Sequence, residues 1–362
     1  MTLVSIEGNL LLLAQPLLSS CPLALSSGCQ NAPPDGSQTN LNRQSFASCL
    51  PNGEAEFLCL GLSIKVVGMA PAPPVVLTIA GFDPSSGAGI SADIKTIAAH
   101  DCYGIACITA LTVQSTRGVW QILPMDPKVI AATLDELASD FDIESVHIGM
   151  LANEDVVLAV AEFLTRRALP HVVLDPILKS SSGSALLDPG GIRRMVQQLV
   201  PVAEVVAPNL DEALALTRLP PAESGESTAQ AVDHMREAAR HLHAIGAANV
   251  VVTGGHLEKA IDLLSFTASR GVEQEVFKAE RQKSTSTHGT GCAFSSALAC
   301  HLAHGRGLPE AVLLSKAYIS AAISNAHPLG HGTGPLHHLY RMNQPRRPTK
   351  IVSEAEQVHS RN

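Results

Sequence analysis

The chain has 362 residues, a formal net charge of −8 and an aromatic content of only 3%. These values argue against a nucleic-acid surface, because such surfaces need clustered cations and flat rings on which bases stack. The eight cysteines include no Cys-x-x-Cys pair, and no apolar run is long enough to span a membrane. The composition therefore predicts a cytoplasmic globular protein with reduced thiols, which binds neither nucleic acid nor a membrane.

Both ends of the chain differ in composition from its middle. Residues 1–70 hold few charges and a stretch rich in Ser, Asn, Gln and Pro, and their leucine-rich start lacks the basic region of a secretory signal. We predict that they form a poorly ordered extension or follow from a start codon assigned too far upstream, with Met69 as the natural first residue. Residues 343–362 are polar and broken by prolines, which predicts a solvated C-terminal tail.

From residue 74, short β-branched runs alternate with amphipathic segments. Strands are predicted at 75–80, 104–113, 145–150, 171–176, 204–209 and 249–255. Helices are predicted at 89–100, 127–139, 153–168, 188–199, 227–245, 291–304 and 308–325. Nearly continuous apolar strands are typical of a parallel sheet covered on both faces. The order predicts one doubly wound α/β domain over residues 71–342, with ligands at the carboxyl ends of its strands.

The first loop with chemical potential is "GFDPSSGAGISADIKT", residues 81–96. Gly87 and Gly89 would let a ligand approach the backbone, and the amides that open the following helix favour an anion or a polar ring. Asp93, one turn into the helix, could accept a hydrogen bond from a ligand hydroxyl or amine. The alternative is an ordinary glycine-rich turn in which Asp83 and Asp93 are solvated or capping carboxylates.

Two further strand ends could contact a flat heteroaromatic ring. In "TALTVQST", the primary amide of Gln114 offers both a donor and an acceptor. In "IGML", Met150 could line an apolar pocket. An exposed loop glutamine and a core methionine are the alternatives.

Carboxylates and an amide follow the next two strands. "VLDP" places Asp175 there, and "APNLDEA" places Asn209 and Glu212. Such oxygens could hold Mg²⁺ and so orient phosphates. Capping of the next helix by Asn209 is the alternative.

The segment "STSTHGTGCAFSSALA" joins a polar loop to an apolar helix. Gly289 and Gly291 permit successive amides to converge, and the helix that begins near Cys292 adds its positive end, which predicts an anion hole. In this field we expect the thiol of Cys292 to have a lowered pKa and to act as a base or a donor. A tight turn before a core helix with a buried cysteine is the alternative.

With these loops in this order, the chain resembles the hydroxymethylpyrimidine/phosphomethylpyrimidine kinases, thiamine-biosynthetic members of the ribokinase-like superfamily. The resemblance covers residues 74–342 and also includes "GGH" and "GHGTGPLHH". It implies a ribokinase-like fold and the ATP-dependent phosphorylation of 4-amino-5-hydroxymethyl-2-methylpyrimidine, then of its monophosphate to the diphosphate. It further implies ATP and Mg²⁺ as cofactors and a homodimer.

The resemblance also assigns roles to residues of this chain. The implied catalytic anion hole is Gly289, Thr290, Gly291 and Cys292; the pyrimidine site is Gly81, Asp93, Gln114 and Met150; the nucleotide site is Asn209, Thr253 and Lys316; the metal site is Asp175 and Glu212. One departure is Thr253, which stands where relatives commonly carry the lysine of Lys-Gly-Gly-His. The departure removes one cation from the neighbourhood of the phosphates.

Three other functions remain open on the sequence. A pyridoxal or pyridoxine kinase acts on a similar flat ring with a hydroxymethyl group. A non-catalytic sensor could bind the pyrimidine or its phosphate. A thiol-dependent hydrolase would use Cys292, but no recognisable partner motif surrounds the adjacent His288.

Overall fold

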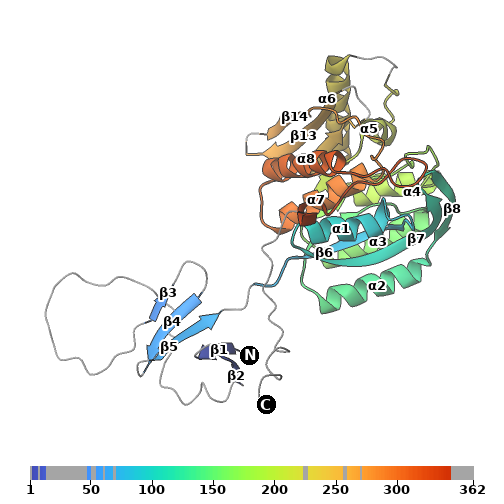
Figure 1. The fold of residues 1–362 in the computed structure, drawn as a ribbon. Helices are drawn as coiled ribbons and strands as arrows, with labels where there is room; N and C mark the ends of the chain where they lie inside the picture. The colour runs from blue at the N-terminus through green and yellow to red at the C-terminus, as the bar shows by residue number, and fades with distance from the viewer. Residues whose placement is uncertain are drawn as a thin grey trace, which may run out of the picture. The chain divides into compact units, whose positions relative to one another are not determined.

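The computed structural model describes residues 71–343 except 223–226, 256–258 and 270, and five strands within residues 2–67 (Figure 1). The chain divides into two compact units, Met1–Ala72 and Pro73–Asn362. Residues 344–362 of the predicted C-terminal tail lie outside the described residues.

The first unit contains an antiparallel sheet that the sequence analysis did not predict. Its five strands run in the order β2-β1-β5-β4-β3. The strands are β1 (Thr2–Ile6), β2 (Asn9–Leu13), β3 (Ala47–Cys49), β4 (Glu54–Cys59) and β5 (Leu62–Val67). The interpretation of residues 1–70 as an extension or an upstream start stays a prediction.

The second unit is built on a sheet of nine strands in its described part, in the order β14-β13-β12-β11-β10-β9-β6-β7-β8. The strands are β6 (Val75–Phe82), β7 (Tyr103–Ser115), β8 (Gly118–Pro124), β9 (Ile143–Ile148), β10 (Val172–Leu174), β11 (Val205–Val206), β12 (Asn249–Thr253), β13 (Ala260–Ala268) and β14 (Gly271–Ala279). The six adjacent strands β7, β6, β9, β10, β11 and β12, in this sheet order, pair in parallel. The outer strands β8, β13 and β14 pair antiparallel at the two edges of the sheet. The predicted strands are all present, and the three antiparallel edge strands were missed.

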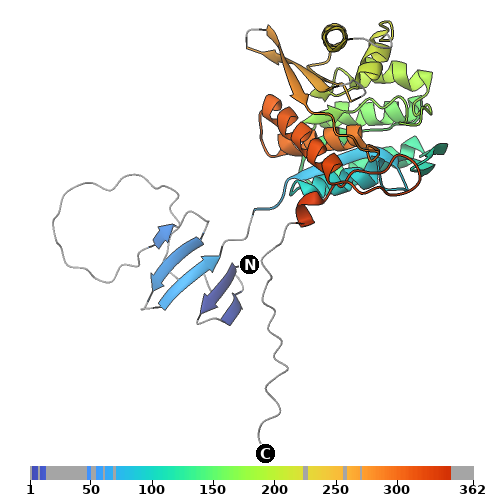
Figure 2. The same cartoon turned by 45° about the horizontal axis from the view of Figure 1, so that its top comes forward.

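Helices cover both faces of this sheet (Figure 2). They are α1 (Gly89–Ala99), α2 (Pro127–Asp140), α3 (Glu154–Arg167), α4 (Pro189–Arg194), α5 (Leu210–Thr217), α6 (Thr228–Ile245), α7 (Thr290–Ala303) and α8 (Leu308–Ser324), with a π-helical turn at Met195–Leu199 and a 3-10 turn at Tyr340–Asn343. Because successive side chains of a strand point to opposite faces, Leu77 and Ile79 of β6 pack with α2 to α6, while Val76 packs with α1, α7 and α8. The predicted doubly wound α/β fold is confirmed.

No described helix is both long enough and apolar enough to cross a membrane.

A group of buried histidines lies where α1, α7, α8 and the C-terminal segment meet. The ring of His100 is 4.9 Å from that of His301 and 4.5 Å from that of Tyr318, measured between centroids. The Nε2 atoms of His100, His301 and His338 are buried without a hydrogen-bond partner among the described residues. Burial therefore lowers the pKa of His301 to about 4, and burial with the nearby Lys95 does the same for His338.

These lowered pKa values predict a loss of stability in mild acid. Below about pH 6.5 the unfolded chain binds protons that the folded chain excludes, so the unfolding free energy falls as the pH drops towards 4. For His338 alone, the loss at about pH 5 should be about 2 kcal/mol. His338→Asn keeps a polar atom for Thr96, which lies 3.1 Å from Nδ1, and should remove this loss.

Chemical denaturation of both proteins at about pH 7.5 and about pH 5 measures the difference. His241→Asn, on the exposed side of α6, is the matched control and should behave as the wild type. An equal acid loss in the wild type and in His338→Asn would contradict the prediction.

Candidate active site

Six of the residues singled out in the sequence lie along the side of the sheet formed by the carboxyl ends of its parallel strands, here named the strand-end edge. Gly81, Gln114, Met150, Asp175, Asn209 and Thr253 stand at or just beyond the carboxyl ends of β6, β7, β9, β10, β11 and β12 respectively. The parallel pairing of these strands brings the six positions to the same edge, where ligands of doubly wound sheets bind.

Gly81 and Met150 form the apolar part of this edge. A side chain at Gly81 would place its Cβ 2.9 Å from Met150 Sδ, so only glycine leaves the methionine its present position. Met150 is buried in a small cluster with Ala110 and Leu186. The Thr109 hydroxyl donates to the Met150 carbonyl at 2.5 Å and fixes its backbone.

Gln114 lies near the carboxyl end of β7, the strand that also carries Ala110, and contacts His288. Its amide nitrogen is 3.3 Å from His288 Nε2, which is also 2.8 Å from Asp83 Oδ2. The Asp83 carboxylate can only accept a hydrogen bond, so His288 Nε2 must carry its hydrogen and donate it to Asp83. An Nε2 that donates cannot also accept from the Gln114 amide nitrogen. If the amide is turned over, its oxygen faces Nε2 and its nitrogen donates to the Thr112 hydroxyl, which itself donates to the Phe82 carbonyl at 2.9 Å.

Asp83 locks the first glycine-rich loop in place. Its carboxylate accepts hydrogen bonds from Ser85 N at 2.8 Å, Ser85 Oγ at 2.7 Å and Ala88 N at 3.0 Å, in addition to His288. Burial would raise the pKa of Asp83, but the hydrogen bonds from His288 and Ser85 outweigh burial and hold it below the ordinary value. Asp83 and His288 were not predicted as site residues; the only signals were their positions inside "GFDP" and "THGTGC".

Two glycines allow the loops to approach one another. Gly89 and Gly289 have φ angles of +57° and +80°. A Cβ on Gly89 would overlap the carbonyl oxygen of Gly81, and one on Gly289 would overlap that of Gly87. Glycine is therefore required at both positions by conformation and by space.

The first turn of α7 is open to an anion. Its N-cap is Gly289, and no described side chain caps its amides. Helices α1 and α8 likewise lack a side-chain cap, whereas side chains cap α2, α3, α4, α5 and α6; the capping residues are Asp126, Asn153, Asp188, Asn209 and Ser227. Amides without a side-chain cap, together with the helix dipole, are suited to bind a phosphate, and the role of residues 289–292 as an anion hole stays a prediction.

The thiol of Cys292 differs from its sequence-based expectation. The predicted lowering of its pKa is wrong: burial raises the pKa well above the ordinary value, and the charges of Asp175 and Asp93 raise it further. A backbone hydrogen bond from Gly89 opposes the rise without cancelling it. The helix dipole was visible in the sequence, but the depth of burial and the two carboxylates were not.

Asp175 and Glu212 are a pair of buried carboxyl groups near this turn. Burial, Glu212 and Asp93 raise the pKa of Asp175, and burial raises the pKa of Glu212 to about 7. Asp175 Oδ2 has no hydrogen-bond partner among the described residues, and it lies 3.7 Å from the position of a Cβ on Gly291. Repelling, partly unsatisfied carboxylates beside an anion site suit a divalent cation between them and a phosphate.

The two carboxylates do not form a complete metal cage. No group of three or more His, Cys, Asp or Glu side chains in the described ranges is arranged to hold a metal ion. Mg²⁺ nevertheless fits, because it commonly takes one or two carboxylates and fills its other positions with water and phosphate oxygens. Asn209 acts as the cap of α5: its Oδ1 accepts from Glu212 N at 2.9 Å, while Glu212 Oε2 accepts from Asn209 N at 3.0 Å.

Asp93 lies inside the protein. Its side chain is fully buried and accepts hydrogen bonds from Thr78 and Ser296, each at 2.8 Å, with His147 Nδ1 3.5 Å away. These partners come from β6, α7 and β9, so Asp93 ties α1 to the sheet and to α7. Its assignment as a pyrimidine-binding residue stays a prediction.

Lys316 uses its charge in a buried ion pair. Its Nζ is 2.6 Å from Asp262 Oδ2, and Asp262 Oδ1 accepts from Gly254 N at 3.1 Å. Asp262 also pairs with Thr253 in the β12–β13 register. Lys316 is thereby linked to the Thr253–Gly254 turn, and Asp262 was not predicted as part of this region.

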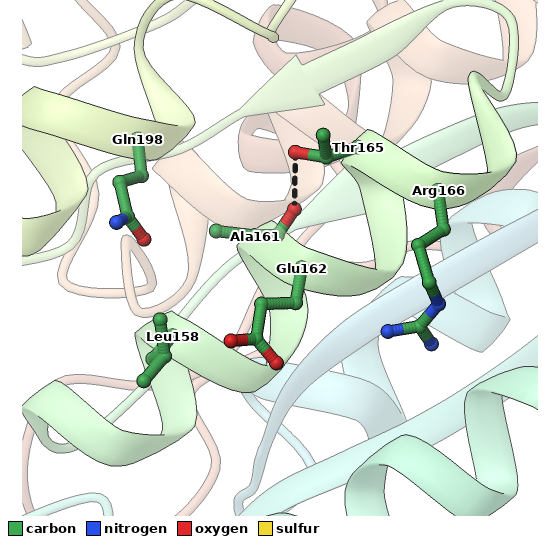
Figure 3. A pocket seen from close by; sticks show the side chains of 6 residues that line it. All are labelled: Leu158, Ala161, Glu162, Thr165, Arg166 and Gln198. Atoms are coloured by element: carbon green, nitrogen blue, oxygen red, sulfur yellow. Dashed lines mark hydrogen bonds between the residues drawn. The ribbon is translucent and has the colours of Figure 1, made fainter.

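A surface hollow elsewhere on the domain is unrelated to these residues (Figure 3). It has a volume of about 460 Å³ and lies between α3 and the π-helical turn. Its lining residues are Leu158, Ala161, Glu162, Thr165, Arg166 and Gln198, none of which belongs to the site described above.

Comparison with known proteins gives matches over most of this unit. The family described as phosphomethylpyrimidine kinase matches residues 83–337. The hydroxymethylpyrimidine/phosphomethylpyrimidine kinase of Escherichia coli is 42% identical over 268 residues, which are 73% of this chain and 97% of that protein. The bifunctional thiamine biosynthesis protein ThiED of Geobacter sulfurreducens is also 42% identical, and the match spans about half of its length, 52%.

A solved structure shows the same fold. The ADP complex of Bacillus subtilis pyridoxal kinase superimposes with a TM-score of 0.66 at 34% identity, over 75% of this chain and 100% of that one. The matched residues include the strand-end positions other than Gly81, the first turn of α7 and the pair Asp175 and Glu212. The chain therefore belongs to the phosphomethylpyrimidine kinase family.

Proposed function

We propose that this chain transfers the terminal phosphoryl group of ATP to 4-amino-5-hydroxymethyl-2-methylpyrimidine, and then to the resulting monophosphate, in thiamine biosynthesis. Family membership and 42% identity to the Escherichia coli kinase support this function. In the structure, the observation that best supports this function is a contact of His288. Its side chain contacts Gln114, and the residue directly precedes Gly289, the N-cap of α7, which has no side-chain cap. A ring-binding amide and an anion hole are thus joined through a single side chain.

In the proposed phosphoryl transfer, some residues position the pyrimidine and others stabilise the charge of the transferred group. Gln114 pairs with the edge of the aminopyrimidine, and Met150 beside Gly81 provides an apolar surface for the ring. The amides of the first turn of α7 stabilise the charge on the transferred group. Cys292 lies at this turn with a raised pKa, which favours a thiol that helps to shape the anion hole over one that removes a proton.

The nucleotide and its cation occupy the other half of the strand-end edge. Asp175 and Glu212 would hold Mg²⁺, which when bound neutralises charge on the phosphates. Thr253 stands where the resemblance implies a lysine, and the turn that follows it is held by Asp262 and Lys316. The related pyridoxal kinase of Bacillus subtilis was solved as a complex with ADP, which supports ATP as the donor here.

We also propose a cytoplasmic homodimer. The buried cysteines at 102, 107, 292 and 300 are free thiols, which is typical of a reducing compartment. Leu111, Val113, Trp120 and Leu123 are exposed on β7 and β8, and such an apolar strip is suited to contact a second copy.

The proposed substrate can be tested with Gln114→Ala. ADP release should be measured with hydroxymethylpyrimidine, its monophosphate and pyridoxal, and both pyrimidines should be turned over faster than pyridoxal. The variant should raise the pyrimidine KM about tenfold and leave the KM for ATP within about twofold, because it loses hydrogen bonds to the ring alone.

Gln197→Ala, an exposed glutamine of the π-helical turn at Met195–Leu199, is the matched control and should behave as the wild type. An unchanged pyrimidine KM in Gln114→Ala would defeat the ring assignment. Preference for pyridoxal would indicate a pyridoxal kinase instead, and binding of the pyrimidine without turnover would indicate a sensor.

The metal assignment predicts two opposite effects of Asp175→Asn. Without Mg²⁺ the variant should unfold at a higher temperature than the wild type, because it removes a carboxylate whose charge is disfavoured by burial and by repulsion from Glu212 and Asp93. With ADP present, Mg²⁺ should raise the melting temperature of the wild type but not that of the variant. The Mg²⁺ concentration for half-maximal rate should increase about tenfold or more.

Asp140→Asn at the exposed end of α2 controls for the loss of one negative charge. Normal stabilisation of Asp175→Asn by Mg²⁺ would show that Asp175 does not hold the cation.

The role of Cys292 can be tested by comparing how its substitution changes kcat/KM in the two phosphorylation steps. A base would matter only for the alcohol of the first step, because the monophosphate acceptor of the second step is already an oxyanion. With a protonated thiol, we expect Cys292→Ala to lower kcat/KM for both steps by a similar factor of about three to ten. Cys292→Ser keeps a donor and should lose less; a loss confined to the first step would establish a base.

A further inference from the structure

The "GHGTGPLHH" motif has a structural partner in the turn between β7 and β8. Thr116 Oγ1 accepts hydrogen bonds from the backbone N–H groups of His331 and Gly332, each at 3.2 Å. Thr333 N donates to the Thr116 carbonyl at 2.9 Å. Residues 330–335, here named the strap, are therefore held to this turn by one residue.

The strap's glycines allow this close contact. A Cβ on Gly330, which has a φ angle of +75°, would collide with the Thr116 side chain. A Cβ on Gly332 would overlap the Thr116 carbonyl oxygen. At these two positions the strap lies against Thr116 too closely for any larger residue.

The other end of the strap is bonded to the loop before α7. Gly334 accepts from His288 N and donates to the Thr285 carbonyl, each at 3.0 Å. His288 in turn contacts the amide of Gln114, which precedes Thr116 by two residues on β7. The contacts therefore form a closed ring from Thr116 through the strap to His288, and from His288 through Gln114 back to Thr116.

We propose that Thr116 is a positioning residue of the pyrimidine site. Its hydroxyl holds the strap to the β7–β8 turn, the strap's Gly334 holds the backbone of His288, and the His288 imidazole then stands against Gln114. Thr116 acts through these residues and needs no contact with substrate. The proposal rests on the proposed function, in which Gln114 binds the pyrimidine ring.

The test compares two variants that open the same contact from opposite sides. Thr116→Val keeps the shape of the side chain but removes the acceptor, whereas Gly332→Ala pushes the strap away and leaves Thr116 intact. Each should raise the pyrimidine KM about five- to tenfold, with kcat and the KM for ATP within about twofold. Thr116→Ser, which keeps the hydroxyl, should restore the wild-type KM.

Matched controls separate this effect from general loss of structure. Thr133→Val lies on the exposed face of α2, and Gly307→Ala adds a methyl group where no atom lies within 4 Å. Both should have wild-type kinetics. Melting temperatures should show that the four valine and alanine variants are folded.

Hydrogen exchange tests the contact without any assay of activity. Amides 331–333 should exchange about fivefold faster or more in Thr116→Val than in the wild type and in Thr116→Ser. Unchanged exchange would overturn the idea that Thr116 holds the strap. Faster exchange with an unchanged pyrimidine KM, or an equal loss for pyrimidine and ATP, would overturn the positioning role. A wild-type protein without pyrimidine turnover would instead overturn the proposed function, and the exchange result would still decide whether the contact exists.

Discussion

The hydrogen bond between His288 and Asp83 joins parts of the chain that are 205 residues apart in sequence. It fixes the first glycine-rich loop against the loop that opens α7, and the same imidazole contacts Gln114. Gly87 and Gly289 also lie backbone to backbone at this junction, because a Cβ on Gly289 would overlap the Gly87 carbonyl oxygen. The proposed ring-binding and phosphate-binding halves of the site are therefore joined by direct contacts, which would help to hold an acceptor hydroxyl in line with a phosphate.

Buried acidic groups dominate the part of the site around Asp175 and Glu212. Asp175, Glu212 and Asp93 bring three carboxyl groups near Cys292, and the pKa shifts of Asp175, Glu212 and Cys292 all run towards the neutral form. Folding alone does not compensate these groups, whereas a cation together with phosphate would. Such uncompensated groups are typical of functional sites, because the stability they cost is recovered only when ligands bind. Lys316 and Asp262 show the opposite arrangement, a buried pair already satisfied within the protein.

The sequence predicted the parallel core of the fold but not its edges. Apolar strands such as β6 and β9 are readable because both of their faces are buried, whereas β14, with the sequence "GVEQEVFKA", is largely exposed and has no such pattern. Strand ends identified Gly81, Gln114, Met150 and Asp175 as neighbours. The direction of the Cys292 pKa could not be predicted, because it depends on carboxylates that only tertiary packing brings close. Likewise, the interior position of Asp93 and the contact of His288 with Asp83 follow from how α1 and α7 pack together.

The strap has a consequence for how the domain is made. Its residues are among the last of the described part of the second unit, yet they bond to a turn at residue 116 and to the loop at residues 285–288. During synthesis the sheet from β6 to β12 can pair before the strap has left the ribosome, but the contact ring around Gln114 cannot close. The contacts around Gln114 thus close only after residues 330–335 have been synthesised, when the strands from β6 to β12 have already been made.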